Sequence, residues 1–154
     1  MKQFVLFLSL LILSPVFAHA KAMTVDADKF ELYEKEQRAE FYGNVIVHRD
    51  AMILKAEHIT IWYEEAQRKK TLKSVVAVGK VLIHTPQHKG SAKKASFSTA
   101  SDLLILTGDA RMESERGVVK GDQIEYNTVT ENTQVISKEK DTQVHFTFEE
   151  KPNE

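Results

Sequence analysis

The histidines are the residues whose type and spacing first raise a question of chemistry. His84 and His88 stand four residues apart, a spacing that brings two imidazoles onto one metal ion when both lie on a helix. Pro86 lies between them and opposes a regular helix. The remaining histidines are scattered along the chain. Because a zinc site needs three or four converging ligands, the sequence predicts no metal and no other cofactor.

Catalytic motifs are equally absent from the sequence. The chain has no cysteine, no GxSxG nucleophile motif and no glycine-rich phosphate loop. The acidic clusters "EKEQRAE" and "EEAQRKK" read as solvated turns rather than acid–base pairs. The 21 Lys and Arg residues nearly balance the 22 Asp and Glu residues, which argues against a general nucleic-acid binder. The sequence therefore predicts that the protein is not an enzyme.

The first twenty residues have the form of a signal peptide. Lys2 precedes the apolar run "FVLFLSLLIL", and "AHA", with Ala18 and Ala20 at the small positions, has the form of a cleavage site. We expect cleavage after Ala20 and export of the remainder. The alternative is a retained membrane anchor, although the apolar run falls short of the roughly 20 residues that span a bilayer.

The residues after the predicted signal peptide have the pattern of β-strands, so strands must position any functional side chains. Apolar and polar residues alternate through most of the chain after residue 22, in about nine short segments separated by turns. In "MILKAEHITIWY" the alternation changes phase near Glu57, which predicts a β-bulge there. The pattern predicts an all-β protein.

Three of these predicted strands contain a glycine in an apolar setting: Gly43 in "FYGNVIV", Gly79 in "AVGKVLI" and Gly108 in "LTGDARM". A glycine inside a strand marks either a bend or a close approach of a neighbouring backbone. Repetition at similar positions favours the bend, because one uniform curve needs a kink in every hairpin. The sequence predicts a stack of kinked antiparallel strands, each layer burying the next.

The segments "FYGNVIVHRDAMILKAEHITIWY" and "LLILTGDARMESERGVVKGDQIEYN" resemble the LptA/OstA-like family of periplasmic lipopolysaccharide transport proteins, over about residues 23–137. The resemblance implies a twisted β-jelly-roll, open at both ends. It divides the chain into a cleavable signal peptide (1–20), an OstA-like domain (21–145) and a charged C-terminal tail (146–154). A membrane-anchored protein with the same domain is an alternative.

The resemblance also implies a function without catalysis. It predicts a periplasmic carrier that binds the lipid A acyl chains of lipopolysaccharide in an apolar groove. The expected partners are inner-membrane anchored and outer-membrane barrel proteins that share the domain, together with further copies of this chain joined head to tail. The alternative from another class is a structural module that polymerises by adding edge strands.

The predicted groove is made of inward-facing apolar residues. On the resemblance, these are Val25, Leu32, Phe41, Val45, Val47, Met52, Leu54, Ile59, Ile61, Val81, Ile83, Phe97, Leu104, Leu106 and Met112. For any single one of them, the competing interpretation is packing in a closed core. Lys89, Lys93 and Lys94 are candidates to contact lipid phosphates at the groove mouth, or else belong to a solubilising strand face.

Overall fold

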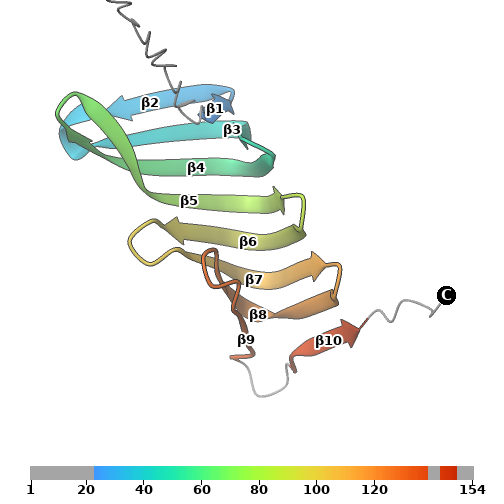
Figure 1. Ribbon diagram of the computed structural model, residues 1–154. Helices are drawn as coiled ribbons and strands as arrows, with labels where there is room; N and C mark the ends of the chain where they lie inside the picture. The colour runs from blue at the N-terminus through green and yellow to red at the C-terminus, as the bar shows by residue number, and fades with distance from the viewer. Residues whose placement is uncertain (1–22, 139–142, 149–154) are drawn as a thin grey trace, which may run out of the picture.

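The computed structural model describes residues 23–138 and 143–148, which form a single ten-stranded antiparallel sheet (Figure 1). The strands are β1 (Met23–Asp26), β2 (Lys29–Tyr33), β3 (Arg38–Arg49), β4 (Met52–Ala66), β5 (Lys69–His84), β6 (His88–Ser98), β7 (Leu103–Ser114), β8 (Gly117–Asn127), β9 (Thr133–Ile136) and β10 (His145–Phe148). A 3-10 turn, η1 (Glu34–Glu36), joins β2 to β3. Within the described ranges no helix is long and apolar enough to cross a membrane. The prediction of an all-β jelly-roll-like fold is confirmed.

Hairpins connect the long strands in sequence order, and two short strands complete each end of the stack. At one end β1 pairs with the second half of β3, and β2 pairs with its first half. At the other end β9 and β10 pair with different halves of β8. The expected domain boundary at residue 145 falls inside β10, which pairs with β8. The predicted signal peptide, with Ala18 and Ala20, lies outside the described residues.

A row of kinks crosses the long strands. At each kink in β3, β5 and β7 a glycine and the next residue both have positive φ, and the strand register shifts. These pairs are Gly43–Asn44, Gly79–Lys80 and Gly108–Asp109. At the middle one φ is 84° for the glycine and 48° for the lysine. Two left-handed residues inserted in a strand form a bulge that bends it, so the predicted bend is present. A register shift does lie beside Glu57, between Lys55 and His58, but the extra residue belongs to β5, at the Gly79–Lys80 kink, and not to β4 as predicted.

Side chains from neighbouring strands close over the kinks on the outer surface. A Cβ atom on Gly79 would lie 2.3 Å from Glu57 Oε2. The same glutamate pairs with Lys80, whose Nζ lies 2.9 Å from Oε1, and Lys93 Nζ lies 2.7 Å from Asp109 Oδ2. The glycines therefore allow both the bend and the close approach of a neighbour, but that neighbour is a side chain rather than the backbone.

The kink row divides the sheet into two half-sheets that face each other. Half-sheet A contains β2, β9 and strand segments 38–42, 58–66, 69–78, 94–98, 103–107 and 123–127; half-sheet B contains β1, β10 and segments 45–49, 52–56, 81–84, 88–92, 110–114 and 117–121. Small and branched side chains beside the kinks fill the angle between them. They include Val45, Ala56, Ile59, Val81, Ala92, Ala110 and Ile124, all buried.

Candidate functional site

Beyond this packed angle the two half-sheets separate and leave a groove with a volume of about 520 Å³. Half-sheet A supplies residues from β4 to β8, and half-sheet B supplies residues from β1 and β3 to β7. The groove therefore lies where the strands diverge, and the kinks decide its position. A concave, mainly apolar site with a few polar groups is the usual form of a ligand-binding pocket.

Most of the residues predicted for an apolar groove line this one. They are Val47, Met52, Leu54, Ile61, Ile83, Phe97, Leu104, Leu106 and Met112. The period-two alternation of the strands is the reason, since it places every second residue on the inner face. The structure adds lining residues that the alternation alone did not single out, including Leu72, Ala77 and Ala95.

The other predicted groove residues lie elsewhere. Val45, Ile59 and Val81 are at most 1% exposed and pack in the angle beside the kinks. Val25 and Phe41 pack against the edge of the core. These residues share the inward face with the groove, but they form the closed core that was the competing interpretation.

Leu32 differs from the rest because it lies on β2 at the end of the stack, with 43% of its surface exposed. It does not line the groove. Its inward-facing position in the alternation does not bury it, because no further strand among the described residues covers β2.

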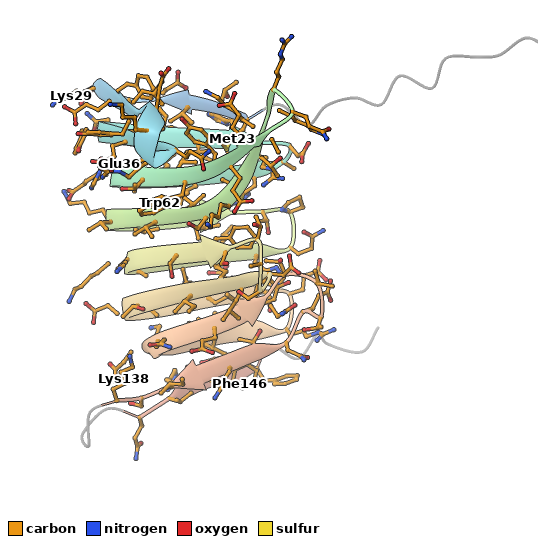
Figure 2. The ribbon with its side chains drawn as sticks, turned by 90° about the vertical axis from the view of Figure 1, so that its left-hand side faces the viewer. Met23, Lys29, Glu36, Trp62, Lys138 and Phe146 are labelled. Atoms are coloured by element: carbon orange, nitrogen blue, oxygen red, sulfur yellow. The ribbon has the colours of Figure 1, made fainter. Side chains whose placement is uncertain are left out.

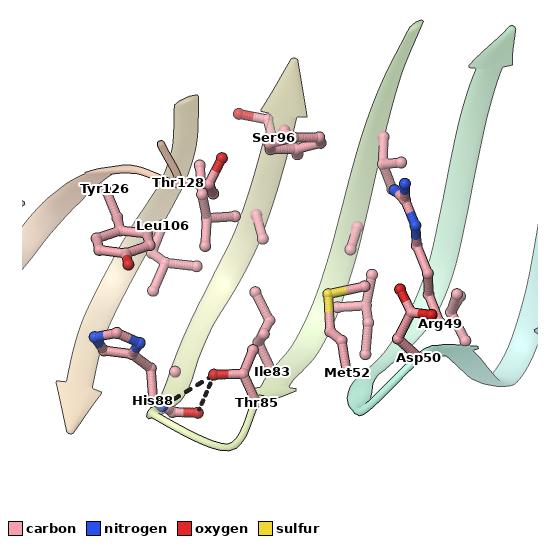
Figure 3. Close-up of a pocket in the computed structure, with 18 of the residues that line it drawn as sticks. Arg49, Asp50, Met52, Ile83, Thr85, His88, Ser96, Leu106, Tyr126 and Thr128 are labelled. Atoms are coloured by element: carbon pink, nitrogen blue, oxygen red, sulfur yellow. Dashed lines mark hydrogen bonds between the residues drawn. The ribbon is translucent and has the colours of Figure 1, made fainter. Parts of the chain in front are cut away.

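Polar groups gather at the mouth of the groove, at the tips of half-sheet B and opposite them (Figure 3). Arg49 ends β3, and Asp50 follows it in the turn to β4. His88 begins β6, where its backbone N–H donates to Thr85 Oγ1 at 3.0 Å, and its ring lies 5.0 Å from that of Tyr126. Burial raises the pKa of Tyr126, so its phenol stays neutral. The mouth thus offers one permanent cation, one acid and several hydrogen-bonding side chains.

Sequence reasoning missed Arg49, although the signal was present. Val45, Val47 and Arg49 continue one period-two face of β3, so the parity that identified the valines also directs the arginine inward. The prediction was confined to apolar side chains and stopped one position too early.

The lysines predicted near the mouth lie on the outer surface instead. Gly90 and Ala95 line the groove, so their neighbours Lys89 and Lys94 face the opposite side and are exposed. The third candidate, Lys93, packs over Gly108 at the kink and pairs with Asp109. None of the three lines the groove, whereas Arg49 does.

The structure does not bring His84 and His88 together. His88 lines the groove, while His84 alternates with the groove-lining Ile83 and is exposed on the outer surface. Among residues 23–138 and 143–148, no group of three or more His, Cys, Asp or Glu side chains could hold a metal ion.

A polar cluster that the sequence did not predict lies on the outer surface of half-sheet A. Glu40 on β3 is 7% exposed, accepts hydrogen bonds from the Tyr42 hydroxyl and Arg38, and has His58 Nε2 at 3.4 Å. The bond from Tyr42 is the main reason that the pKa of Glu40 lies below its ordinary value. The same bond raises the pKa of Tyr42.

This outer cluster extends to the edge strand β2. The Arg38 guanidinium lies 4.2 Å from the centre of the Tyr33 ring, and the Tyr33 hydroxyl donates to Glu31 at 2.9 Å. Lys29 also pairs with Glu31, at 2.8 Å. The pKa shifts hold Glu31 charged and Tyr33 neutral, so these groups bind each other and are not poised for proton transfer.

Comparison with known proteins gives concordant results. A family model described as LptA/(LptD N-terminal domain) LPS transport protein matches residues 24–132. RP507, an uncharacterized protein of Rickettsia prowazekii (strain Madrid E), is 25% identical over 129 residues, which cover 80% of this chain and 88% of that protein. Among solved structures, the fold is similar to LptH of Pseudomonas aeruginosa, described as the LptA homologous periplasmic component of the conserved lipopolysaccharide transport device. The TM-score is 0.74 at 16% identity, covering 84% of this chain and 96% of LptH.

Proposed function

Since the chain belongs to the LptA/(LptD N-terminal domain) family of LPS transport proteins, we propose that it is a periplasmic carrier that holds lipid A acyl chains in the groove between its half-sheets. Membership in the family confirms the resemblance found in the sequence. Because this is a family of transport proteins, the expectation that the chain is not an enzyme is confirmed as well.

The observation that carries the proposal is the apolar groove. Acyl chains gain roughly 0.8 kcal/mol for each methylene removed from water, and no specific polar contact is needed for that gain. A carrier must also release its load. A groove formed along the divergent side of two half-sheets, rather than a closed cavity, suits both requirements.

The mouth of the groove supports an anionic head group. Arg49 is the lining residue with a permanent positive charge, and a guanidinium binds phosphate in bidentate geometry. Asp50 follows Arg49 at the mouth and carries the opposite charge, so the region suits a single anionic group bound on the guanidinium side (Figure 3). Lys89, Lys93 and Lys94 are weaker candidates for phosphate contact, because they face away from the groove.

Both ends of the stack support head-to-tail assembly. Each end is an edge whose outermost strands have one side unpaired within the described chain, which is a template for strand addition. Exposed apolar side chains accompany both edges: Phe30 and Leu32 on β2 are 55% and 43% exposed, and Phe146 and Phe148 on β10 are 50% and 69% exposed. The expected partners are further copies of this chain and the membrane proteins that share the domain. A signal peptide at residues 1–20 would deliver the carrier to the periplasm.

Photo-crosslinking at two adjacent positions of β7 tests the groove. Leu104 lines the groove, whereas Ile105 faces the outer surface of the same half-sheet. With a photoreactive residue at each position in turn, lipopolysaccharide should give adducts at 104 and not at 105. Equal labelling at both positions, or none at either in folded protein, would remove the groove as the lipid site. The structural-module alternative would then be favoured.

A further inference from the structure

A second hollow lies on the outer surface of half-sheet A, at the end where η1, β4 and β5 meet. It is a shallow depression of about 360 Å³, lined among others by Trp62, Glu36, Gln37, Lys73 and Ser74. Figure 2 shows Glu36 and Trp62 near each other on one side of the molecule. Trp62 is the single tryptophan of the chain and is only partly buried.

The backbone around the depression is irregular in a way that the fold does not require. The register shifts of the long strands lie on the kink row, except for one between Trp62 and Tyr63. There Trp62 pairs with Ser74 and Tyr63 with Leu72, so Lys73 is an extra residue in β5. Bulges of this kind redirect a side chain, and this one turns Lys73 toward the depression.

Hydrogen bonds fix the polar rim. Arg38 Nη2 lies 2.8 Å from Glu36 Oε2 and holds that carboxylate in place. The backbone N–H of Tyr63 donates to the carbonyl oxygen of Gln37 at 2.9 Å, which ties the turn after η1 to β4. The carbonyl oxygen of Lys73 accepts from the Thr99 N–H at 3.0 Å. The backbone of the rim is therefore held in place, which lowers the entropic cost of binding a ligand.

From these observations we infer that the depression binds a saccharide. An indole offers an apolar face with a polar edge, and the C–H face of a sugar ring can stack on it. Around Trp62, a carboxylate, an amide, an ammonium and a hydroxyl supply donors and acceptors for sugar hydroxyls. An aliphatic ligand would offer no hydrogen bond to any of these groups. The cations Lys73 and Arg38 are matched by Glu64 and Glu36, so the site suits a sugar of low net charge better than a polyanion.

The position of the depression also connects it with the groove. Leu72 lines the groove on the inner side of β5, and Lys73 lines the depression on the outer side. A glycolipid with its acyl chains in the groove could place its sugars over this rim. That connection rests on the proposed function, whereas saccharide binding at Trp62 stands by itself.

Titration with a neutral hexose oligosaccharide tests the inference, because this probe has no net charge and no acyl chain to enter the groove. Emission from Trp62 reports on the depression alone, since the chain has no other tryptophan. We expect a saturable change in emission. Calorimetry on Trp62→Ala should show that the affinity falls by about tenfold or more. Trp62→Phe keeps an aromatic ring and should retain part of the wild-type affinity.

Two lysines provide the matched control. Lys73→Ala should weaken binding several-fold, whereas Lys80→Ala removes a lysine that also pairs with a glutamate but lies at the kink, and should leave binding unchanged. Equal losses in both variants would overturn the site. Absence of any emission change, while acylated lipopolysaccharide still labels position 104, would overturn this inference and leave the proposed function intact. Saccharide binding without groove labelling would support the site and remove the proposed function instead.

Discussion

The two ends of the stack have the same topology but are held in different ways. At each end two short strands pair with the two halves of one long strand. At the first end, side chains reinforce this pairing: Phe30 of β2 packs on Phe41 at 5.0 Å between ring centres, and Tyr33 packs against Arg38. At the second end all four residues of β10 are exposed, and its ring contact joins Phe146 to Phe148 within the same strand.

The difference shows that strand order does not fix the strength of an edge. Backbone pairing defines both edges, but contacts between side chains of different strands decide how firmly the outermost strand is held. We infer that β2 keeps its place when its edge is free, and that β10 adjusts to whatever docks beside it.

Substitutions in the core should have the largest effects on stability. The core is packed near both ends of the stack, so the two ends should respond alike. Ile59 on β4 and Ile124 on β8 are both 0% exposed. Ile59→Ala and Ile124→Ala should each lower the free energy of unfolding by about 2–5 kcal/mol. Urea denaturation followed by circular dichroism measures this. If only Ile59→Ala lowered the free energy of unfolding, the core near β8 would itself be loosely packed. The difference between the two ends would then not be limited to surface contacts.

The kinks should give the next largest effects, again at both ends. Gly43 and Gly108 have φ values of 74° and 82°, where a side chain is strained. Gly43→Ala and Gly108→Ala should each cost about 1–3 kcal/mol of stability. Gly90→Ala is the control for φ, because Gly90 does not have a positive φ and a Cβ atom there would meet nothing closer than the end of the Leu106 side chain, at 3.2 Å. If the control were as damaging as the two kink variants, the strain argument would be wrong.

The outer surface of half-sheet A should separate the two ends. Glu40 and Glu125 lie in the same cross-strand row, each beside an edge, but only Glu40 is buried and bound by an arginine. Glu40→Gln leaves Arg38 without its buried carboxylate and should cost about 1–3 kcal/mol, whereas Glu125→Gln should cost under about 0.5 kcal/mol. Thermal unfolding of both variants at neutral pH checks the contrast.

Acid sharpens the same comparison. The pKa of Glu40 in the folded protein lies below its ordinary value of 4.5, so its contribution to stability is present above that pH. It is lost as the pH falls through the lowered pKa. Wild type and Glu40→Gln should therefore converge in stability on acidification below pH 4.5. A constant gap between the two would show that the contribution of Glu40 is not electrostatic.

The smallest effect on stability should come from β10. Phe146→Ser together with Phe148→Ser removes exposed side chains, and the unfolding free energy should change by less than about 0.5 kcal/mol. Self-association, measured by analytical ultracentrifugation, should nevertheless weaken. Hydrogen exchange should also be faster in β10 than in β2. Strong protection of β10 in the monomer would contradict the contrast between the ends.

The fold could be predicted because its signals are local. Period-two alternation identified the strands, the glycines marked the kinks, and the phase change near Glu57 marked where β4 crosses the kink row. The inner face of the groove follows from the same alternation. Alternation does not tell how far a residue lies from the kink. Val45 and Val47 share a face, but only distance from the kink decides that Val45 packs in the core and Val47 lines the groove.

The cluster around Glu40 and the depression at Trp62 could not be predicted for a different reason. Their members come from β2, η1, β3, β4 and β5, and they meet because cross-strand register aligns Tyr33, Arg38 and Trp62 in one row. The register between two strands cannot be predicted from the spacing of residues within either strand. The position of Lys89 and Lys94 on the outer surface depends on the same information, since the pairing of β6 with its neighbours decides which face of the sheet they occupy.

The kink row makes the molecule modular. Every hairpin carries both walls of the groove, because each of its strands passes through the kink and contributes to both half-sheets. Neighbouring strands are about 4.8 Å apart, so inserting one more kinked hairpin would lengthen the groove by about 10 Å without changing its width. The number of hairpins thus sets the length of the groove, whereas the bend within each strand sets its width. Groove length and groove width can therefore change independently of each other.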